Sequence, residues 1–302
     1  MSDSRELCAG EMRFAVVGTN RSVLYAAKWL SQFGASLEGV ATIEKARALA
    51  SAPLAILVAG DTHLGVAGSA AVTEIFLWDF EVERAGIGAF ACAVSGVSAV
   101  IGTAKGAPGF MPAFIPEKWA GILGASLALS LQVARTSKSK MPARRIDVSA
   151  ADVLRANAEQ NSGNHAGVPY GWRRNGRTAV EHGGVFPQGF FRCRDGFVAV
   201  QARSRQDWQA IIAALDNPEW SKDPAFGNPF KLSLDDSKVV PLLDSELTKY
   251  DRNELLDRAI ATGAPLAPVL SFDEANSRKV FRPNFVKQDG GLNPPFVVTR
   301  GS

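Results

Sequence analysis

The first half of the chain alternates short β-forming runs with segments of helical periodicity. Apolar residues recur at helical spacing from Ser22 to Phe33, and Gly34 is placed to end that helix. Strands that alternate with helices predict a parallel sheet with right-handed crossovers. The runs of strand length are residues 13–18, 35–40, 54–58 and 74–78.

A second helical stretch and a further strand follow. Residues 117–136 are rich in Ala and Leu, and the small residues Gly121 and Gly124 indicate close packing against another element. Residues 146–148 predict a strand, and Ser149 is a natural N-cap for a helix over residues 150–160. Asp152 then lies in the first helical turn, where the macrodipole and free amides favour a carboxylate.

The pattern changes after this helix. Residues 161–188 are rich in Gly, Arg and Asn without periodicity, which is typical of a linker or an active-site loop. Residues 189–193 and 197–201 flank Arg194-Asp195-Gly196 and predict a hairpin with Asp-Gly in its turn. Helices over 206–215, 242–248 and 252–261 and an extended edge segment over 265–270 follow.

These elements predict an α/β protein with two domains. The larger is Rossmann-like with a parallel sheet, and the smaller is α+β. We assign residues 1–175 and 280–302 to the large domain, 176–188 to a linker, and 189–279 to the small domain.

A strand that ends in glycine before a helix also suggests dinucleotide binding. Gly18 supplies only the first glycine of GxGxxG, and the other two are needed for backbone approach to the pyrophosphate and for helix packing. A plain βαβ opening is therefore the preferred interpretation, and a Rossmann-type oxidoreductase is a lesser alternative.

Composition narrows the class of protein. The 302 residues are 46% hydrophobic and 21% charged with a net charge of +3, and the basic residues form no nucleic-acid-binding stripe. Three widely spaced cysteines and three histidines favour neither a disulfide framework nor a metal site. No signal peptide or membrane span is evident, so we expect a cytoplasmic protein that binds neither nucleic acid nor membrane.

Several segments, taken in order, carry a family pattern. They are Ser95-Gly96, Ile101-Gly102 with Pro108, Glu117–Gly121, Asp147–Asp152, Gly189–Gly196, Asn217–Phe226 and Ala264–Val269. From about residue 90 to 286 this order resembles the class III CoA-transferases, the carnitine dehydratase and bile-acid-inducible family that includes formyl-CoA transferase-like enzymes. Asp152 stands where that family keeps its nucleophile.

The resemblance implies acyl transfer. Asp152 would form an aspartyl anhydride and then an aspartyl-CoA thioester, moving CoA from an acyl-CoA to a carboxylic acid. Gly183 and Gly184 are candidates for the oxyanion-stabilising loop, and Arg21 and Lys138 for contacts with CoA phosphates. CoA is then a substrate, and no tightly bound cofactor or metal is expected. Without the resemblance, Asp152 would be a first-turn carboxylate that stabilises the helix dipole by about 0.3–1 kcal/mol.

The resemblance leaves alternatives open. The chain resembles a shortened member, with Ser22-Val23-Leu24 where the family has a turn that helps to dock CoA. It could therefore be a subunit of a heteromer with a longer homologue, whereas the family itself implies homodimers. A lyase or racemase-like activity on CoA thioesters is a further alternative. Ile87 replaces the histidine expected of racemases, and Glu117 stands at their aspartate position.

Overall fold

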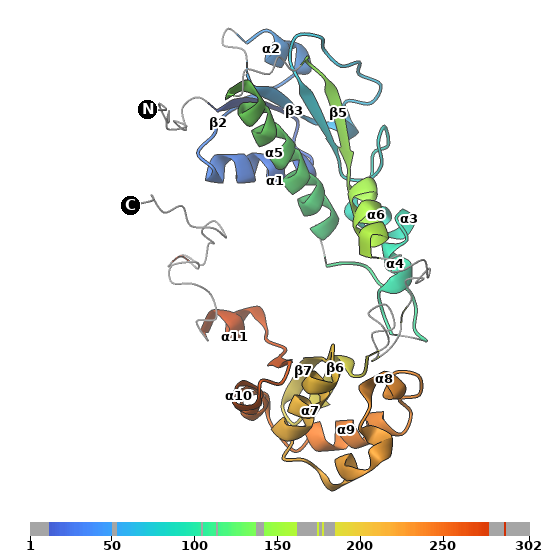
Figure 1. The fold of residues 1–302 in the computed structure, drawn as a ribbon. Coiled ribbons are helices and arrows are strands. Elements are labelled where there is room, and N and C mark those ends of the chain that lie inside the picture. The colour runs from blue at the N-terminus through green and yellow to red at the C-terminus, as the bar shows by residue number, and fades with distance from the viewer. Residues whose placement is uncertain are drawn as a thin grey trace. The chain divides into compact units, whose positions relative to one another are not determined.

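The structure is a computed structural model that divides into two compact units, Met1–Arg174 and Asn175–Ser302 (Figure 1). We call them the first unit and the second unit. The residues that the structure describes are 12–49, 53–103, 105–112, 114–136, 142–161, 174, 177, 185–277 and 287.

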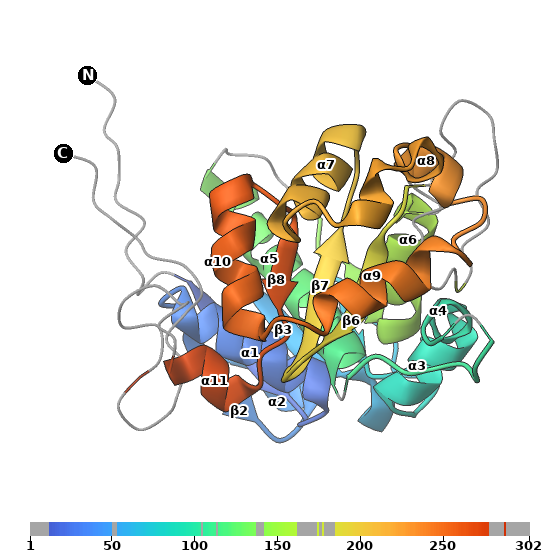
Figure 2. The same ribbon diagram turned by 90° about the horizontal axis from the view of Figure 1, so that it is seen from below.

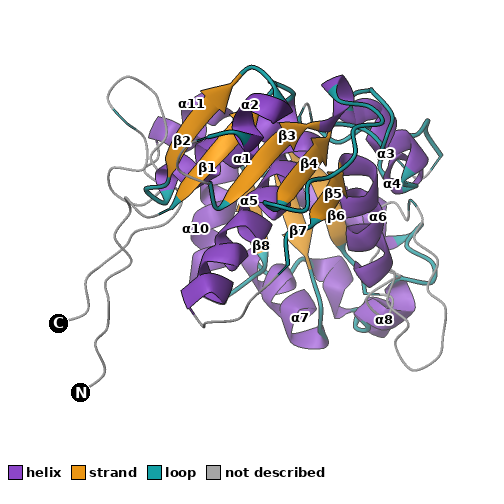
Figure 3. Ribbon diagram, turned by 90° about the horizontal axis from the view of Figure 1, so that it is seen from above, coloured by secondary structure: helices purple, strands orange, loops and turns teal. Residues whose placement is uncertain are grey.

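The first unit contains a five-stranded parallel sheet (Figure 3). The strand order is β2-β1-β3-β4-β5, and every neighbouring pair is parallel. The predicted parallel sheet is therefore confirmed. The strands are β1 (Arg13–Val17), β2 (Ser36–Val40), β3 (Ala55–Ala59), β4 (Glu74–Trp78) and β5 (Arg145–Ser149).

Side chains alternate between the two faces along each strand, and both faces carry apolar residues. Helices therefore cover both faces of this sheet. Phe14, Leu57 and Leu77 face the core beneath α1, α5 and α6, whereas Val58 and Phe76 face the core beneath α2. The helices of the first unit are α1 (Arg21–Gln32), α2 (Ile43–Arg47), α3 (Gly88–Val94), α4 (Val97–Val100), α5 (Ile115–Thr136) and α6 (Ala150–Asn161).

The expected close packing of the long helix is confirmed. A Cβ on Gly121 would lie 2.6 Å from the Ser22 carbonyl oxygen of α1, and one on Gly124 would lie 2.5 Å from a methyl group of Leu77. The small residues of α5 therefore bring its backbone against α1 and the sheet. Gly34 adopts a left-handed conformation (φ +84°) directly after α1, as predicted.

The second unit is α+β (Figure 2). Strands β6 (Gln188–Cys193), β7 (Gly196–Gln201) and β8 (Leu266–Pro268) form an antiparallel sheet in that order. The hairpin is confirmed, but its turn is Arg194-Asp195, because Gly196 already pairs with Cys193. The helices are α7 (Arg205–Ala214), α8 (Pro229–Leu232), α9 (Val239–Leu247), α10 (Arg252–Thr262) and α11 (Phe272–Ser277).

An aromatic cluster fills much of the core of the second unit. Trp208 is 2% exposed, packs edge-on against Phe186, and donates from Nε1 to the Phe226 carbonyl oxygen at 2.8 Å. Val185 and Phe186, which we had assigned to the linker, are buried in this core. The predicted return of residues 280–302 to the large domain falls outside the described residues, except at Lys287. None of the described helices has the length and apolarity needed to cross a bilayer.

Candidate active site

Parallel strands bring residues from four separate segments to one edge of the sheet in the first unit. The segment after β1 supplies Asn20 and Arg21, and the segment after β3 supplies Asp61. Asp79 follows β4, and Asp152 lies just past the end of β5. Ligands of open α/β sheets bind at the carboxyl ends of the strands, so this carboxyl edge is the candidate active site.

Asp152 lies in the first turn of α6, as predicted. Ser149 pairs with Trp78 at the end of the sheet, and the Ala151 amide donates to the Phe80 carbonyl oxygen at 3.0 Å. These two contacts fix the start of α6 to the end of β4. The Asp152 side chain is exposed to solvent at the carboxyl edge.

Ser149 makes two hydrogen bonds with Asp152. Its hydroxyl oxygen accepts from the Asp152 amide at 3.0 Å, which is the predicted N-cap. The same hydroxyl donates to Asp152 Oδ2 at 2.6 Å, and Ser149 itself is fully buried. Within the described part of the chain Oδ1 has no hydrogen-bond partner, so this oxygen is free to react.

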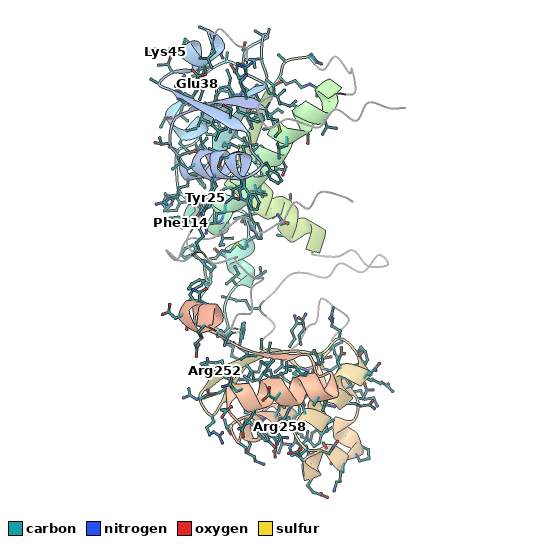
Figure 4. All side chains as sticks on the ribbon, turned by 90° about the vertical axis from the view of Figure 1, so that its left-hand side faces the viewer. Tyr25, Glu38, Lys45, Phe114, Arg252 and Arg258 are labelled. Carbon is teal, nitrogen blue, oxygen red and sulfur yellow. The ribbon has the colours of Figure 1, made fainter. Side chains whose placement is uncertain are left out.

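Arg21 extends from the first residue of α1 at the same edge. Its guanidinium lies 3.5 Å from the centroid of the Phe114 ring (Figure 4 labels Phe114), a distance suited to a cation–π contact. Phe114 has a left-handed backbone (φ +67°) just before α5. Among the described residues no carboxylate pairs with this guanidinium, so it is available to an anionic group.

The amino terminus of α1 is already occupied by a carboxylate of the chain itself. Asp79 accepts hydrogen bonds from the amides of Arg21 and Ser22, both at 2.9 Å, and from the Ser22 hydroxyl at 2.6 Å. A dinucleotide-binding fold needs this helix terminus for its pyrophosphate. A Cβ at Gly18 would also lie 2.6 Å from the Ala59 side chain, so the turn after β1 is closely packed. The geometry therefore argues against the Rossmann oxidoreductase alternative.

Asp61 is a partly buried acid that the sequence did not single out. Asn20 donates to its Oδ2 and to the Leu77 carbonyl oxygen, and the Asp79 amide donates to the same Oδ2 at 3.3 Å. Its Oδ1 is buried without a partner among the described residues. Burial raises the pKa of Asp61 above its ordinary value, against the lowering effect of the Asn20 hydrogen bond.

Glu117 is the second unusual acid of the first unit. It is 3% exposed, and its Oε1 accepts from the Gly88 amide at 2.9 Å. Its Oε2 is buried and has no partner within the described residues. A Cβ on Gly88 would collide with this carboxylate, so a larger residue there would displace the Glu117 side chain. Ile87, next to it, is 54% exposed and has no ionisable group.

Two cysteines are unsuited to nucleophilic chemistry. Cys92 and Cys193 are free and buried. Burial raises the pKa of both thiols above the ordinary value, which disfavours the reactive thiolate. Asp152 is therefore a better nucleophile candidate than either of these cysteines.

Gly183, Gly184 and Lys138 lie outside the described residues. No sequence pattern predicts the buried carboxylate oxygens of Asp61 and Glu117, because both depend on contacts with segments distant in the chain. A Ser-x-x-Asp pattern after a strand did signal the N-cap, but not the second hydrogen bond from Ser149.

Comparison with known proteins supports one family. The sequence matches CoA-transferase family III over residues 81–292, although no curated protein matches it. The fold is similar to that of a CaiB/BaiF family protein from Brucella suis, with a TM-score of 0.76 and 13% identity over 96% of this chain and 92% of that one. It is also similar to a hypothetical protein from Mycobacterium tuberculosis, with a TM-score of 0.69 and 17% identity over 93% and 88% of the two chains. The family match spans more than half of the sequence, and the chain belongs to CoA-transferase family III.

Proposed function

We propose that this protein transfers CoA from an acyl-CoA to a carboxylic acid, with Asp152 as the nucleophile. The observation that carries this proposal is the Asp152 carboxylate itself. It is exposed at the carboxyl edge of the sheet, with one oxygen bound by Ser149 and the other without a hydrogen-bond partner among the described residues. Family membership supplies the reaction class, and an open carboxylate oxygen is what attack on a thioester requires.

The reaction divides into four displacements. Asp152 attacks the thioester carbonyl, and CoA leaves as its thiolate to give a mixed anhydride. The thiolate attacks Cγ of Asp152, releasing the donor acid as a carboxylate and forming an aspartyl-CoA thioester. The acceptor carboxylate then attacks Cγ and expels the thiolate, giving a new anhydride. Attack of the thiolate on the acceptor carbonyl releases the new acyl-CoA and regenerates Asp152.

Binding of CoA requires cationic and amide donors. The Arg21 guanidinium, stacked on Phe114, is suited to a phosphate group. Lys138 is our second candidate for a phosphate contact. Gly183 and Gly184 are candidates for the amide donors that stabilise the oxyanion on the substrate carbonyl, each donor being worth about 3 kcal/mol.

Trapping of the covalent intermediate tests the proposal. The isolated chain is incubated with acetyl-CoA, succinyl-CoA or benzoyl-CoA and then with hydroxylamine, which converts an activated aspartyl group into a hydroxamate. We expect peptide mass mapping to place the hydroxamate on Asp152, and Asp152→Ala to abolish labelling and turnover.

A matched control comes from a second helix. Asp207 lies in the first turn of α7, three residues after the N-cap Ser204, so Asp207→Ala removes an acid in the same local setting. This variant should label like the wild type. Turnover by Asp152→Ala at the wild-type rate would contradict the proposal.

The same experiment addresses the subunit alternative. A heteromer would require a longer homologous chain to complete the site, whereas we propose that the protein acts as a homodimer. The chain spans 92% of the Brucella structure, so the shortening relative to that protein is small. Labelling of the isolated chain would contradict the heteromer, and labelling only after addition of a homologous partner would support it.

A second function is favoured by Glu117. A buried carboxylate with one oxygen unpartnered among the described residues is suited to accept a proton, as lyase or racemase-like chemistry at the carbon next to a thioester requires. This alternative predicts solvent deuterium in the acyl-CoA after incubation in D2O, and its loss in Glu117→Gln. Glu219→Gln, at a surface side chain that is 86% exposed, is the control.

A further inference from the structure

Ser149 is placed to act on Asp152 during catalysis as well as to cap α6. An ionised carboxylate has no proton, so the hydrogen bond between the two side chains at 2.6 Å must use the serine hydrogen. The Ser149 hydroxyl oxygen also accepts a hydrogen bond from the Asp152 amide at 3.0 Å. The hydroxyl proton is therefore directed at Oδ2, and full burial of Ser149 keeps water from competing for it.

This arrangement makes the two oxygens of Asp152 unequal. Oδ1 has no partner among the described residues and is the oxygen free to attack a thioester. Oδ2 would then be the carbonyl oxygen of the anhydride and of the aspartyl-CoA thioester. It remains next to the hydroxyl that already binds it.

We propose that Ser149 donates the hydrogen bond that stabilises the oxyanion formed on Asp152 itself, an inference that rests on the proposed function. In the second and third displacements the nucleophile attacks Cγ of Asp152, so negative charge develops on Oδ2. A donor already aligned with that oxygen stabilises the charged transition state more strongly than it stabilises the neutral acyl group that precedes it. In the first and fourth displacements the charge develops on a substrate carbonyl, where Ser149 has no direct role.

The proposal makes a selective prediction for Ser149→Gly. Glycine is tolerated at an N-cap, so α6 should be retained, with a melting temperature within about 2 °C of the wild type. Formation of the aspartyl-CoA thioester should slow by about 10²–10³-fold. Formation of the acyl anhydride, which precedes it, should stay within about tenfold of the wild-type rate, because Oδ2 gains no charge in that step.

Rapid-quench mass spectrometry of the intact protein separates these steps. The full-length chain is mixed with whichever acyl-CoA of the panel labels Asp152 fastest, without acceptor, and the acyl and CoA adducts are followed in time. Ser149→Thr, which keeps the hydroxyl, should restore thioester formation to within about tenfold of the wild type. If the glycine variant does not fold, Ser149→Cys keeps the volume with a weak donor and should show the same selective loss.

Ser204→Gly is the matched control, because it removes the same N-cap from α7. There the nearby Asp207 carboxylate accepts instead from the Arg203 amide, at 2.7 Å. The Ser204→Gly variant should form both adducts on Asp152 at the wild-type rates. If Ser149→Gly forms the thioester at the wild-type rate, the role of Ser149 is disproved while the aspartyl mechanism stands. If the wild type forms neither adduct on Asp152, the proposed function fails and this inference fails with it.

Discussion

At the scale of single residues, Arg252 links three segments of the second unit. Its guanidinium binds Glu274 through two nitrogens at 2.7 and 3.1 Å and Asp195 at 3.2 Å, and it also donates to the Val269 carbonyl oxygen. The planar fork of arginine suits such a bidentate contact. Hydrogen bonds from Arg252 and from the Ser271 amide lower the pKa of Glu274 to about 2.

This contact predicts a pH dependence. An unfolded chain titrates glutamate near pH 4.3, so ionised Glu274 stabilises the second unit above about that pH. The stabilisation is lost as the pH falls from there through about 2. In Arg252→Met the Glu274 pKa should rise toward about 4.3, as measured by NMR of its carboxyl carbon between pH 3.5 and 6. Arg258→Met, on the same helix but paired with Asp216, should leave it unchanged. Both arginines are labelled in Figure 4.

Residue roles were predictable from the sequence where they depend on neighbours in the chain. The position of Asp152 in a first turn follows from Ser149 three residues before it. The burial of Glu117 does not, because its partner Gly88 lies 29 residues away on another helix. Local capping has a sequence signature, whereas a contact between distant segments has none in one sequence.

At the scale of elements, the close contact between α1 and α5 depends on a glycine, Gly121, which has no side chain. Gly121→Ala adds a methyl group where the Ser22 carbonyl oxygen would lie 2.6 Å away and Tyr25 Cβ 2.8 Å away. Alanine favours a helix by about 1 kcal/mol over glycine, but overpacking costs about 1–3 kcal/mol.

We therefore expect Gly121→Ala to lower the free energy of unfolding by up to about 2 kcal/mol in urea titrations, because the helix-propensity gain offsets part of the overpacking cost. Ser126→Ala is the control, because Ser126 is an exposed residue of the same helix. It should be neutral or slightly stabilising. Increased stability of Gly121→Ala would mean that α1 and α5 accommodate the methyl group without cost.

The length of a helix explains whether the sequence pattern predicted it. The pattern predicted α1, α5, α6, α7 and α10 nearly in full, since each has at least ten residues. It did not predict α2, α3, α4, α8 or α11, which have four to seven residues. A helix this short is unstable alone and gives too few turns for periodicity, so tertiary packing decides it.

At the scale of the whole molecule, each unit has its own hydrophobic core. The sheet of the first unit is packed on both faces, and the core of the second unit is built around Trp208. A compact unit with its own core can fold alone. We expect a fragment of residues 175–302 to unfold cooperatively in urea when followed by tryptophan fluorescence.

Tryptophan emission distinguishes a folded fragment from an unfolded one. Trp208 and Trp220 are the tryptophans of this fragment, and Trp208 is 2% exposed, so folding should give a blue-shifted emission. Trp208→Ala, which removes the centre of the core, should abolish the transition. A fragment with water-exposed emission and no transition would show that the second unit depends on the first.

The sequence by itself determined the parallel strands, the long helices, the hairpin and the first-turn position of Asp152. These follow from periodicity, capping and turn chemistry, which act over a few residues. Only the tertiary structure decided the strand order, the carboxylate of Asp79 at the start of α1, and the buried carboxylate oxygens of Asp61 and Glu117. Each of these depends on segments that are distant in sequence and meet only when the sheet is assembled. The setting of Asp152 depends on both, since Ser149 caps α6 locally, whereas only the assembled sheet places this carboxylate at its carboxyl edge.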